Sequence, residues 1–309
     1  MLKRMLRLLS VSVMITMIVM VSSAAFAQDD VSKIEITSQQ VADGVYVLNT
    51  VTGGNIGLSV GDQGIFMVDT GQAVELMDKI MAEISKISPQ PVRLALNTHW
   101  HFDHIAGNEY LGQKGVTLLS HENVWKRLTT EQKLTAFNMT IPPAAKEGQP
   151  VETFSDAMTL HLNGDDIVIS HPGAAHTDGD ALVYWQKANV LQTGDLYFEG
   201  LYPFIDVEHG GSINFMIDVA TKVMETINDT TKIIPGHGPV SDKAKMQAYV
   251  AMLTGIRDNI RALIAEGKTM EDIVAAKPTQ QFDNIWGKGF LTPDQFTQLV
   301  YSDLIREKK

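Results

Sequence analysis

The sequence of 309 residues contains no cysteine. This absence excludes a cysteine nucleophile, a thiolate-ligated metal and any disulfide bond. It also excludes a lipid anchor attached through a cysteine near the N-terminus. A Gly-x-Ser-x-Gly turn is absent as well, which disfavours a hydrolase built on a Ser-His-Asp triad.

Basic residues are in the minority, with 25 Lys and Arg against 36 Asp and Glu. Three of the basic residues, Lys3, Arg4 and Arg7, lie in the first 27 positions. Without that segment, 22 basic residues remain against 36 acidic ones, a net charge of −14. Such a surface repels phosphate backbones. The composition therefore favours a small-molecule substrate over nucleic acid, and it says nothing about the oligomeric state.

The N-terminus has the three parts of a secretory signal peptide. A basic start is followed by an apolar stretch, Leu8–Val21, and then by Ala25-Phe26-Ala27 before Gln28. The apolar stretch is shorter than the about 20 residues of a typical membrane-spanning helix. We therefore expect residues 1–27 to be a cleaved signal peptide, with no stable membrane anchor and a mature protein that is periplasmic or secreted.

In contrast to these absences, one short segment is rich in residues that can bind a metal. Three histidines and an aspartate lie within six positions: His99, His101, Asp103 and His104. They follow the apolar run 92–96, which is typical of a buried strand. In a chain that stays extended, His99, His101 and Asp103 point the same way, while His104 leaves at an angle toward a second ion. Imidazole and carboxylate are ligands that zinc and similar divalent metals prefer.

Further candidate ligands are spread along the chain. His176, Asp195 and His237 each follow an apolar segment and lie in a turn that contains Gly or Pro. Loops of this kind bring functional groups together at strand ends. Asp69 ends another apolar run in Asp-Thr-Gly and is a candidate partner that orients a ligand.

These motifs, in this order, resemble the metallo-β-lactamase-fold hydrolase superfamily over roughly residues 40 to 240. The resemblance implies two zinc ions per chain. It places one on His99, His101 and His176 and the second on Asp103, His104 and His237, with Asp195 bridging the two. It also implies that Asp103 is the catalytic proton carrier.

The chemistry that follows is hydrolytic. Two cations about 3.5–4 Å apart can hold a hydroxide between them, because coordination lowers the pKa of water from about 15.7 to about 7. We therefore expect cleavage of a small-molecule ester, lactone, thioester or amide-like bond. A true metallo-β-lactamase is the alternative enzyme, and a non-catalytic metal-binding protein is the alternative from another class. The sequence leaves the native metal open among zinc, iron and manganese.

Two departures from the cysteine-ligated β-lactamases bear on the substrate. Those enzymes carry Cys where this chain has Asp195, and usually a lysine where it has Phe198. A bridging aspartate instead resembles the thioesterases and lactonases of the superfamily. The loop that follows Asp195 supplies candidate substrate contacts, namely Tyr197, Tyr202, Phe204 and His209. The remaining histidines, His121, His161 and His171, are not favoured as ligands.

The fold class expected is α/β, an αββα sandwich over residues 28–265 with a small helical extension over 266–309. Antiparallel strands are expected between 45 and 69, then a helix over 73–87. The second half repeats this pattern, with short strands near positions 161, 168, 183 and 190. A helix over 213–227 follows, capped by Ser212.

Three amphipathic helices are expected after the sandwich, over 242–264, 269–275 and 293–305. Trp286, Phe290 and Phe296 are expected to dock them onto it. This segment is interpreted as a packing appendage, with a lid or a dimerisation element as the functional alternative.

Overall fold

The computed structural model describes residues 33–50 and 53–306. The expected signal peptide and its cleavage site lie outside these residues. Within the described ranges, no helix combines the length and the apolar character that crossing a membrane requires.

The first sheet has seven strands in the order β1-β2-β3-β4-β5-β6-β9. Neighbouring strands from β1 to β4 are antiparallel, which confirms the expectation for residues 45 to 69, and β4, β5, β6 and β9 are parallel. The strands are β1 (Thr37–Ala42), β2 (Val45–Asn49), β3 (Ile56–Gly61), β4 (Gly64–Val68), β5 (Val92–Asn97), β6 (Thr117–His121) and β9 (Glu152–Phe154).

The second sheet has six strands in sequence order, from β10 to β15. All neighbours are antiparallel except β13 and β14, which are parallel. The strands are β10 (Ala157–Leu162), β11 (Asp165–Ser170), β12 (Leu182–Trp185), β13 (Val190–Gln192), β14 (Lys232–Ile234) and β15 (Ser241–Asp242). A separate hairpin that the sequence did not predict consists of β7 (Gln132–Leu134) and β8 (Met139–Ile141).

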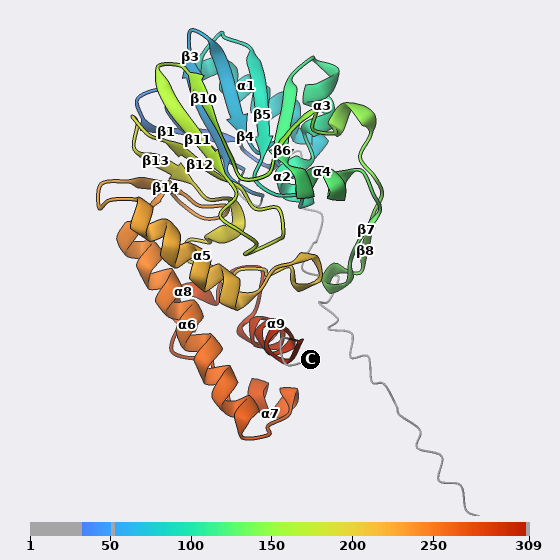
Figure 1. The fold of residues 1–309 in the computed structure, drawn as a ribbon, viewed down its shortest axis with the longest axis vertical. Helices are drawn as coiled ribbons and strands as arrows, with labels where there is room; N and C mark the ends of the chain where they lie inside the picture. The colour runs from blue at the N-terminus through green and yellow to red at the C-terminus, as the bar shows by residue number, and fades with distance from the viewer. Residues whose placement is uncertain (1–32, 51–52, 307–309) are drawn as a thin grey trace, which may run out of the picture.

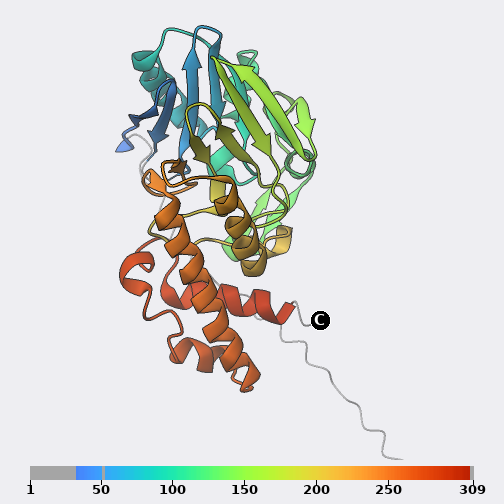
Figure 2. The same ribbon diagram turned by 60° about the vertical axis from the view of Figure 1, so that its left-hand side comes forward.

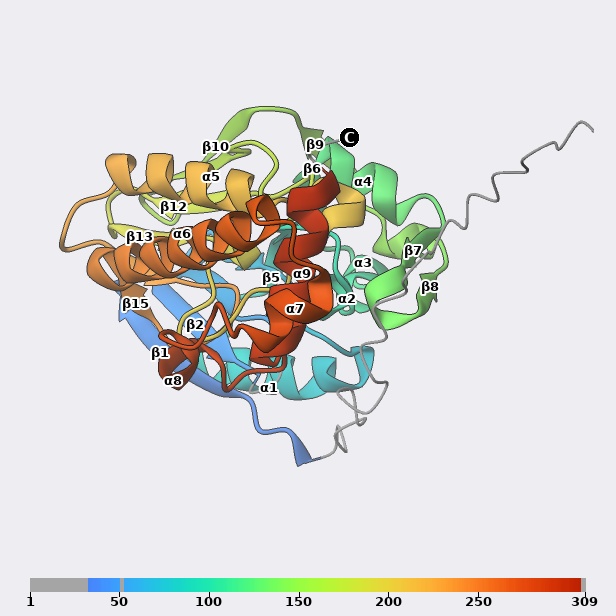
Figure 3. The ribbon, with the colours of Figure 1, turned by 90° about the horizontal axis from the view of Figure 1, so that it is seen from below.

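Helices cover the outer faces of both sheets, as Figure 3 shows, with α1 outside the first sheet and α5 and α6 outside the second. The fold is the αββα sandwich that the sequence predicted. The outer helices are α1 (Met77–Ile87), α5 (Ile213–Thr226) and α6 (Lys243–Ala265), and shorter helices are α2 (Phe102–Ile105), α3 (Asn108–Gln113) and α4 (Glu122–Leu128). The Ser212 side chain accepts a hydrogen bond from the backbone N–H of Asn214, which confirms the expected N-cap of α5.

Strand β4 shows how the sequence produces the layers. Its residues alternate between two faces because successive side chains of a strand point in opposite directions. Phe66 and Val68 join the hydrophobic cluster between the sheets, whereas Ile65 and Met67 join the cluster beneath α1. A strand covered on both faces therefore has an uninterrupted apolar sequence.

The C-terminal helices lie below the two sheets (Figures 1 and 2). They are α7 (Met270–Ala275), α8 (Asp283–Trp286) and α9 (Pro293–Arg306). Thr269 and Asp272 form a reciprocal capping box at the start of α7. Phe296 is fully buried and stacks on Tyr202 with ring centroids 4.6 Å apart, as expected for a docking residue. The extension therefore shares one hydrophobic cluster with α5 and α6.

Candidate metal centre

The histidine cluster lies where β5 ends and α2 begins. The strand ends at Asn97, the chain bends over residues 98–100, and it becomes helical at Phe102 after the N-cap residue His101. The expectation that His99, His101 and Asp103 point the same way is therefore wrong, because extended geometry ends before Asp103. The helical turn carries Asp103 into a different group from the two histidines.

One group of ligands, here called the enclosed group, comprises His99, His101, His176 and Asp195. One ligand atom of each lies within 4.8 Å of the others, and all four residues are buried. His99 and His101 come from the turn after β5. His176 follows β11, and Asp195 follows β13.

The other group, here called the open group, comprises Asp103, His104 and His237. His237 Nε2 lies 3.2 Å from Asp103 Oδ2. The side chains of Asp103 and His237 are 18% and 14% exposed. No side chain of the enclosed group exceeds 6%. Solvent therefore reaches the centre on the side of the open group.

Asp195 lies between the two groups. Its Oδ2 is 3.5 Å from His176 Nε2 in one group and 3.5 Å from His237 Nε2 in the other. Its Oδ1 is 3.1 Å from His104 Nε2. The structure thus brings together all seven residues that the resemblance assigned as ligands and puts Asp195 in the central position.

Two glycines permit this close approach. A β-carbon on Gly236 would lie 2.0 Å from Asp195 Oδ1, and one on Gly54 would lie 2.3 Å from His104 Cε1. Neither position can take a side chain without displacing a ligand. The loop before β3 and the turn before His237 therefore depend on glycine to reach the centre.

The nitrogen atoms of the enclosed group show what the centre is built to hold. His176 Nδ1 is 2.8 Å from the carbonyl of Phe204, and His101 Nε2 is 2.8 Å from Asp206 Oδ2. Carbonyl and carboxylate oxygens only accept, so both ring nitrogens must donate. In a neutral imidazole the other nitrogen then carries a lone pair. These lone-pair atoms, His176 Nε2 and His101 Nδ1, face one another at 2.9 Å, an arrangement that fits a shared cation.

Unpartnered atoms point to the same conclusion. His99 Nε2, His104 Nε2 and Asp195 Oδ1 are buried and have no hydrogen-bond partner within the described part of the chain. Buried polar atoms normally have one, so three orphans around one point need a ligand. Nitrogen and oxygen donors without sulfur suit zinc and other divalent metals. The residues therefore fit a metal cofactor.

The pKa values of the histidines differ between the two groups. Burial lowers the pKa of His176 to about 4 and holds that of His99 well below its ordinary value, so both are neutral at pH 7. Burial opposes protonation of His237 too, but Asp195 and Asp103 outweigh it and raise its pKa to about 9. Without a metal, a proton therefore occupies the open group, and metal binding must release it.

The other two histidines from the turn after β5, His104 and His99, are also oriented by a second contact. Asp69 Oδ2 lies 2.9 Å from His104 Nδ1, and Asp69 also accepts hydrogen bonds from the backbone N–H and the hydroxyl of Thr98. Thr98 Oγ1 in turn lies 3.1 Å from His99 Nδ1. The structure thus places Asp69 beside a ligand, where the sequence suggested an orienting role.

Sequence reasoning missed Asp206. Its carboxylate contacts His101 Nε2 and also His209 Nδ1, at 2.7 Å. Burial would raise the pKa of Asp206, but these two histidines hold it below its usual range. Residue type alone did not single it out, since the loop chosen for its aromatic residues also contains Glu199 and Glu208. That loop supports the ligands instead of lining an opening.

The aromatic candidates for substrate contact lie in the interior. Tyr197 and Tyr202 are 0% exposed. The Tyr202 hydroxyl donates to Asp283 Oδ1 at 2.8 Å, and that of Tyr197 contacts Ser241 Oγ at 2.8 Å. These two residues therefore present no surface to a substrate in this arrangement, because the C-terminal helices and β15 cover them. Phe204 and His209 are also buried, and they act on His176 and Asp206 as described above.

The three discounted histidines lie outside both groups. His121 is the N-cap of α4, and its ring stacks on His171 at 4.0 Å. His161 is on the surface, with its Nδ1 2.6 Å from Asp166 Oδ1.

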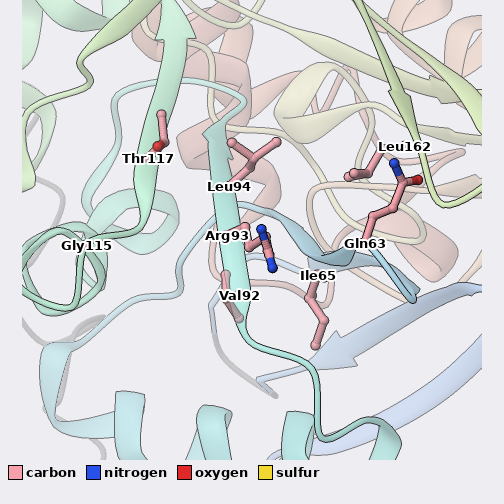
Figure 4. A pocket seen from close by; sticks show the side chains of 9 residues that line it. Gln63, Ile65, Val92, Arg93, Leu94, Gly115, Thr117 and Leu162 are labelled. Atoms are coloured by element: carbon pink, nitrogen blue, oxygen red, sulfur yellow. The ribbon is translucent and has the colours of Figure 1, made fainter.

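A cavity of about 610 Å³ lies elsewhere in the sandwich (Figure 4). Its lining includes Val92 and Arg93 at the start of β5, and Gln63. The candidate ligands follow the opposite end of β5, so this cavity is not part of the metal centre.

Comparison with known proteins gives relatives of two activities. The chain is 23% identical over 251 residues to a linear primary-alkylsulfatase of a Pseudomonas species, an alignment that covers 69% of this chain and 47% of that enzyme. It is 23% identical over 241 residues to the type 2 metallo-beta-lactamase of Bacteroides fragilis, covering 74% of this chain and 87% of that one. The chain thus spans about half the length of the alkylsulfatase.

Solved structures share the fold. A metallo-beta-lactamase from Pontibacter korlensis superposes with a TM-score of 0.60 at 19% identity, over 71% of this chain and 99% of that one. A stereoselective inverting sec-alkylsulfatase from Pseudomonas sp. superposes with a TM-score of 0.64 at 15% identity, over 86% of this chain and 50% of that one. The family model of the metallo-beta-lactamase superfamily matches residues 49–237. The chain therefore belongs to the metallo-beta-lactamase superfamily.

Proposed function

We propose that this protein is an exported hydrolase that binds two zinc ions and cleaves a small-molecule ester or lactone, with thioesters and amide-like bonds as related substrates. The observation that carries the proposal is the pair of adjacent ligand groups with the Asp195 carboxylate between them. A non-catalytic metal-binding protein would have no need of an opening at Asp103 and His237.

The residues divide the work. When bound, two divalent cations supply a water of lowered pKa and polarise the electrophile. His99, His101 and His176 would hold one cation through ring nitrogens, and the carboxylate of Asp195 lies within reach of both ligand groups. Asp103 is at the opening. Burial would raise its pKa, but His104 and His237 hold it well below its usual range, so its carboxylate is ionised at neutral pH.

Phe198 supports an uncharged or amphipathic substrate. It stands where cysteine-ligated β-lactamases usually have a lysine that binds the drug's carboxylate. Here its ring stacks on His237, with centroids 5.0 Å apart and planes 14° apart. A phenylalanine at this position supplies no positive charge to bind the carboxylate of a β-lactam.

A true β-lactamase is the second candidate. It is favoured by the 87% of the Bacteroides fragilis enzyme that the alignment covers. The name of the Pseudomonas relative adds alkyl sulfates to the substrates worth testing.

One comparison of turnover decides among them. A single zinc-loaded preparation of residues 28–309 is given a lactone, an activated carboxylic ester, an alkyl sulfate, a penicillin and a carbapenem. We expect kcat/KM for the lactone or the ester to exceed that for both β-lactams. Efficient turnover of the carbapenem with lactone and ester untouched would establish the β-lactamase instead.

The metal content is tested directly. We expect purified protein to bind up to two zinc ions per chain through nitrogen and oxygen atoms alone. X-ray absorption at the zinc edge checks the ligands, and elemental analysis counts the ions. Sulfur scattering, or a single iron in place of zinc, would refute the assignment.

The proposal of export rests on the pattern of residues 1–27. N-terminal sequencing of protein from the periplasmic fraction should begin at Gln28. A retained Met1 on membrane-bound protein would contradict it.

A further inference from the structure

The approach to the metal centre is on the side of Asp103 and His237, the two most exposed ligands. A substrate must therefore lie against whatever flanks His237. Phe198 covers the face of that imidazole and is itself buried. Next to Phe198 lies Phe290 of the C-terminal extension, with ring centroids 6.4 Å apart.

Phe290 differs from the other aromatic residues of the extension. The sequence predicted that it would dock, as Phe296 does, but 37% of Phe290 remains exposed. Exposed apolar side chains are ordinary when they are scattered over a surface. This one instead continues a line of rings that runs from the ligand His237 through Phe198.

The backbone around Phe290 is held on the sandwich. The carbonyl of Trp286 accepts a hydrogen bond from the backbone N–H of Tyr202 at 3.0 Å. Gly289 lies so close to Leu201 that an added β-carbon would be 2.8 Å from its Cδ2. Leu291 is buried on the other side of Phe290. The ring is thus presented by anchored neighbours, and the loop after Asp195 meets the extension at this point.

We infer that Phe290 forms an apolar wall of the substrate site and takes the alkyl or acyl chain of the substrate while the scissile bond lies at the metal centre. The inference rests on the proposed hydrolytic function and names its substrate class. The C-terminal extension then contributes to specificity and is more than a packing element.

A wall of this kind has a measurable signature. Each methylene group that it removes from water strengthens binding by about fourfold. Affinity for straight-chain ligands should therefore rise with length up to the reach of Phe290 and then level off. Truncation of the ring should flatten that rise.

The test uses two series on the zinc-loaded protein of residues 28–309. Esters of p-nitrophenol with acetate, butyrate, hexanoate and octanoate give kcat/KM against chain length. Calorimetric titration with butanoate, hexanoate and octanoate gives affinity without turnover. The variants are Phe290→Ala and Phe290→Leu. Phe215→Ala is the matched control, because Phe215 is exposed to a similar degree, at 48%, in the first turn of α5.

We expect both series to rise with chain length in the wild type and in Phe215→Ala. We expect them to be nearly flat in Phe290→Ala and intermediate in Phe290→Leu. Equal slopes in wild type and Phe290→Ala would overturn the inference. A lower apparent mass of Phe290→Ala on gel filtration, together with unaltered slopes, would also overturn it. Phe290 would then contact a second copy of the chain instead of the substrate.

The two proposals can fail separately. If no ester is cleaved but carboxylate binding loses its length dependence in Phe290→Ala, the inference about Phe290 is supported and the proposed ester hydrolysis is refuted. If the wild type and Phe290→Ala cleave esters with the same length dependence, the proposed hydrolysis is supported and the inference about Phe290 is refuted.

Discussion

The enclosed and open ligand groups lie side by side but are built differently. In the enclosed group, His101 and His176 are each oriented by an acceptor on the loop that follows Asp195, and every side chain is nearly inaccessible. In the open group, His104 is oriented by Asp69, but Asp103 and His237 retain contact with solvent.

The two groups also differ in the protonation of their histidines at neutral pH. Burial keeps His176 and His99 neutral, so the enclosed group is ready for a cation at neutral pH. The carboxylates beside His237 and His104 hold the pKa of both above the ordinary value, so the open group must give up protons to bind. Under the proposal of two cations, the enclosed group would hold its cation more firmly, and the cation of the open group would be more sensitive to pH and more accessible to substrate.

The largest effects should come from removal of a ligand. His176→Ala should empty mainly the enclosed site, and His237→Ala mainly the open site. Each should weaken its own cation by more than about 100-fold, since loss of an orienting partner alone costs about 10–100-fold. Elemental analysis after dialysis against a chelator counts the ions that remain. If both variants lost the same ion, the division into two groups would be wrong.

Asp195→Asn should affect both groups at once. It removes a negative charge that offsets two adjacent dications while keeping the shape of the side chain. We expect the fold to persist, as judged by circular dichroism, and the zinc content and turnover to fall together. Zinc content and rate equal to those of the wild type would show that Asp195 does not bridge.

A smaller effect is expected from Asp206→Asn, which leaves all seven ligands in place. It weakens the contact that orients His101, so affinity at the enclosed site should fall by about 10–100-fold with little change at the open site. Competition with a zinc-binding dye gives the two constants. Asp166→Asn is the control, because Asp166 pairs with the exposed His161 on the surface. Equal losses in the two variants would point to a general effect of charge.

The smallest predicted effect is a pH dependence at His121, outside both groups. Burial and the adjacent His171 lower the pKa of His121 below its ordinary value. As pH falls through about 6.5, the unfolded chain gains a proton there and the folded chain does not, so the free energy of unfolding decreases. His121→Asn keeps an acceptor at the N-cap of α4 and removes this titration.

Urea unfolding at pH 7 and pH 5 measures this effect as a difference between two proteins. The wild type should lose more stability on acidification than His121→Asn. Groups that do not contact His121 are unchanged in the variant, so their contributions cancel. A larger loss in the variant would show that the sign is wrong.

Much of the fold could be predicted from the sequence because the pattern is local. The apolar run of β5, the alternation from β2 to β4 and the Ser212 cap of α5 each depend on neighbours within a few residues. The short hairpin of β7 and β8 was missed, since each of its strands has only three residues, too few for a period of two to stand out.

The seven ligand positions were also accessible from the sequence, because residue type and order along the chain identify them. Their grouping was not accessible from local geometry. Extended periodicity grouped Asp103 with His99 and His101, whereas the family resemblance assigned it to His104 and His237. The structure agrees with the resemblance, because the chain bends after Asn97 and becomes helical at Phe102. When the backbone changes from extended to helical, the side chains that follow point in new directions, and the period of two of a strand does not predict them.

The sequence by itself determined which chemistry is available: histidine and carboxylate ligands, no thiol, and an acidic surface. Only the tertiary structure decided what surrounds the ligands. It turned Tyr197 and Tyr202 into the interior, assigned Asp206 to His101, and brought Phe290 beside Phe198 across more than ninety residues of chain. The physical reason is that burial and long-range contact depend on how helices and sheets pack together, which no single segment encodes.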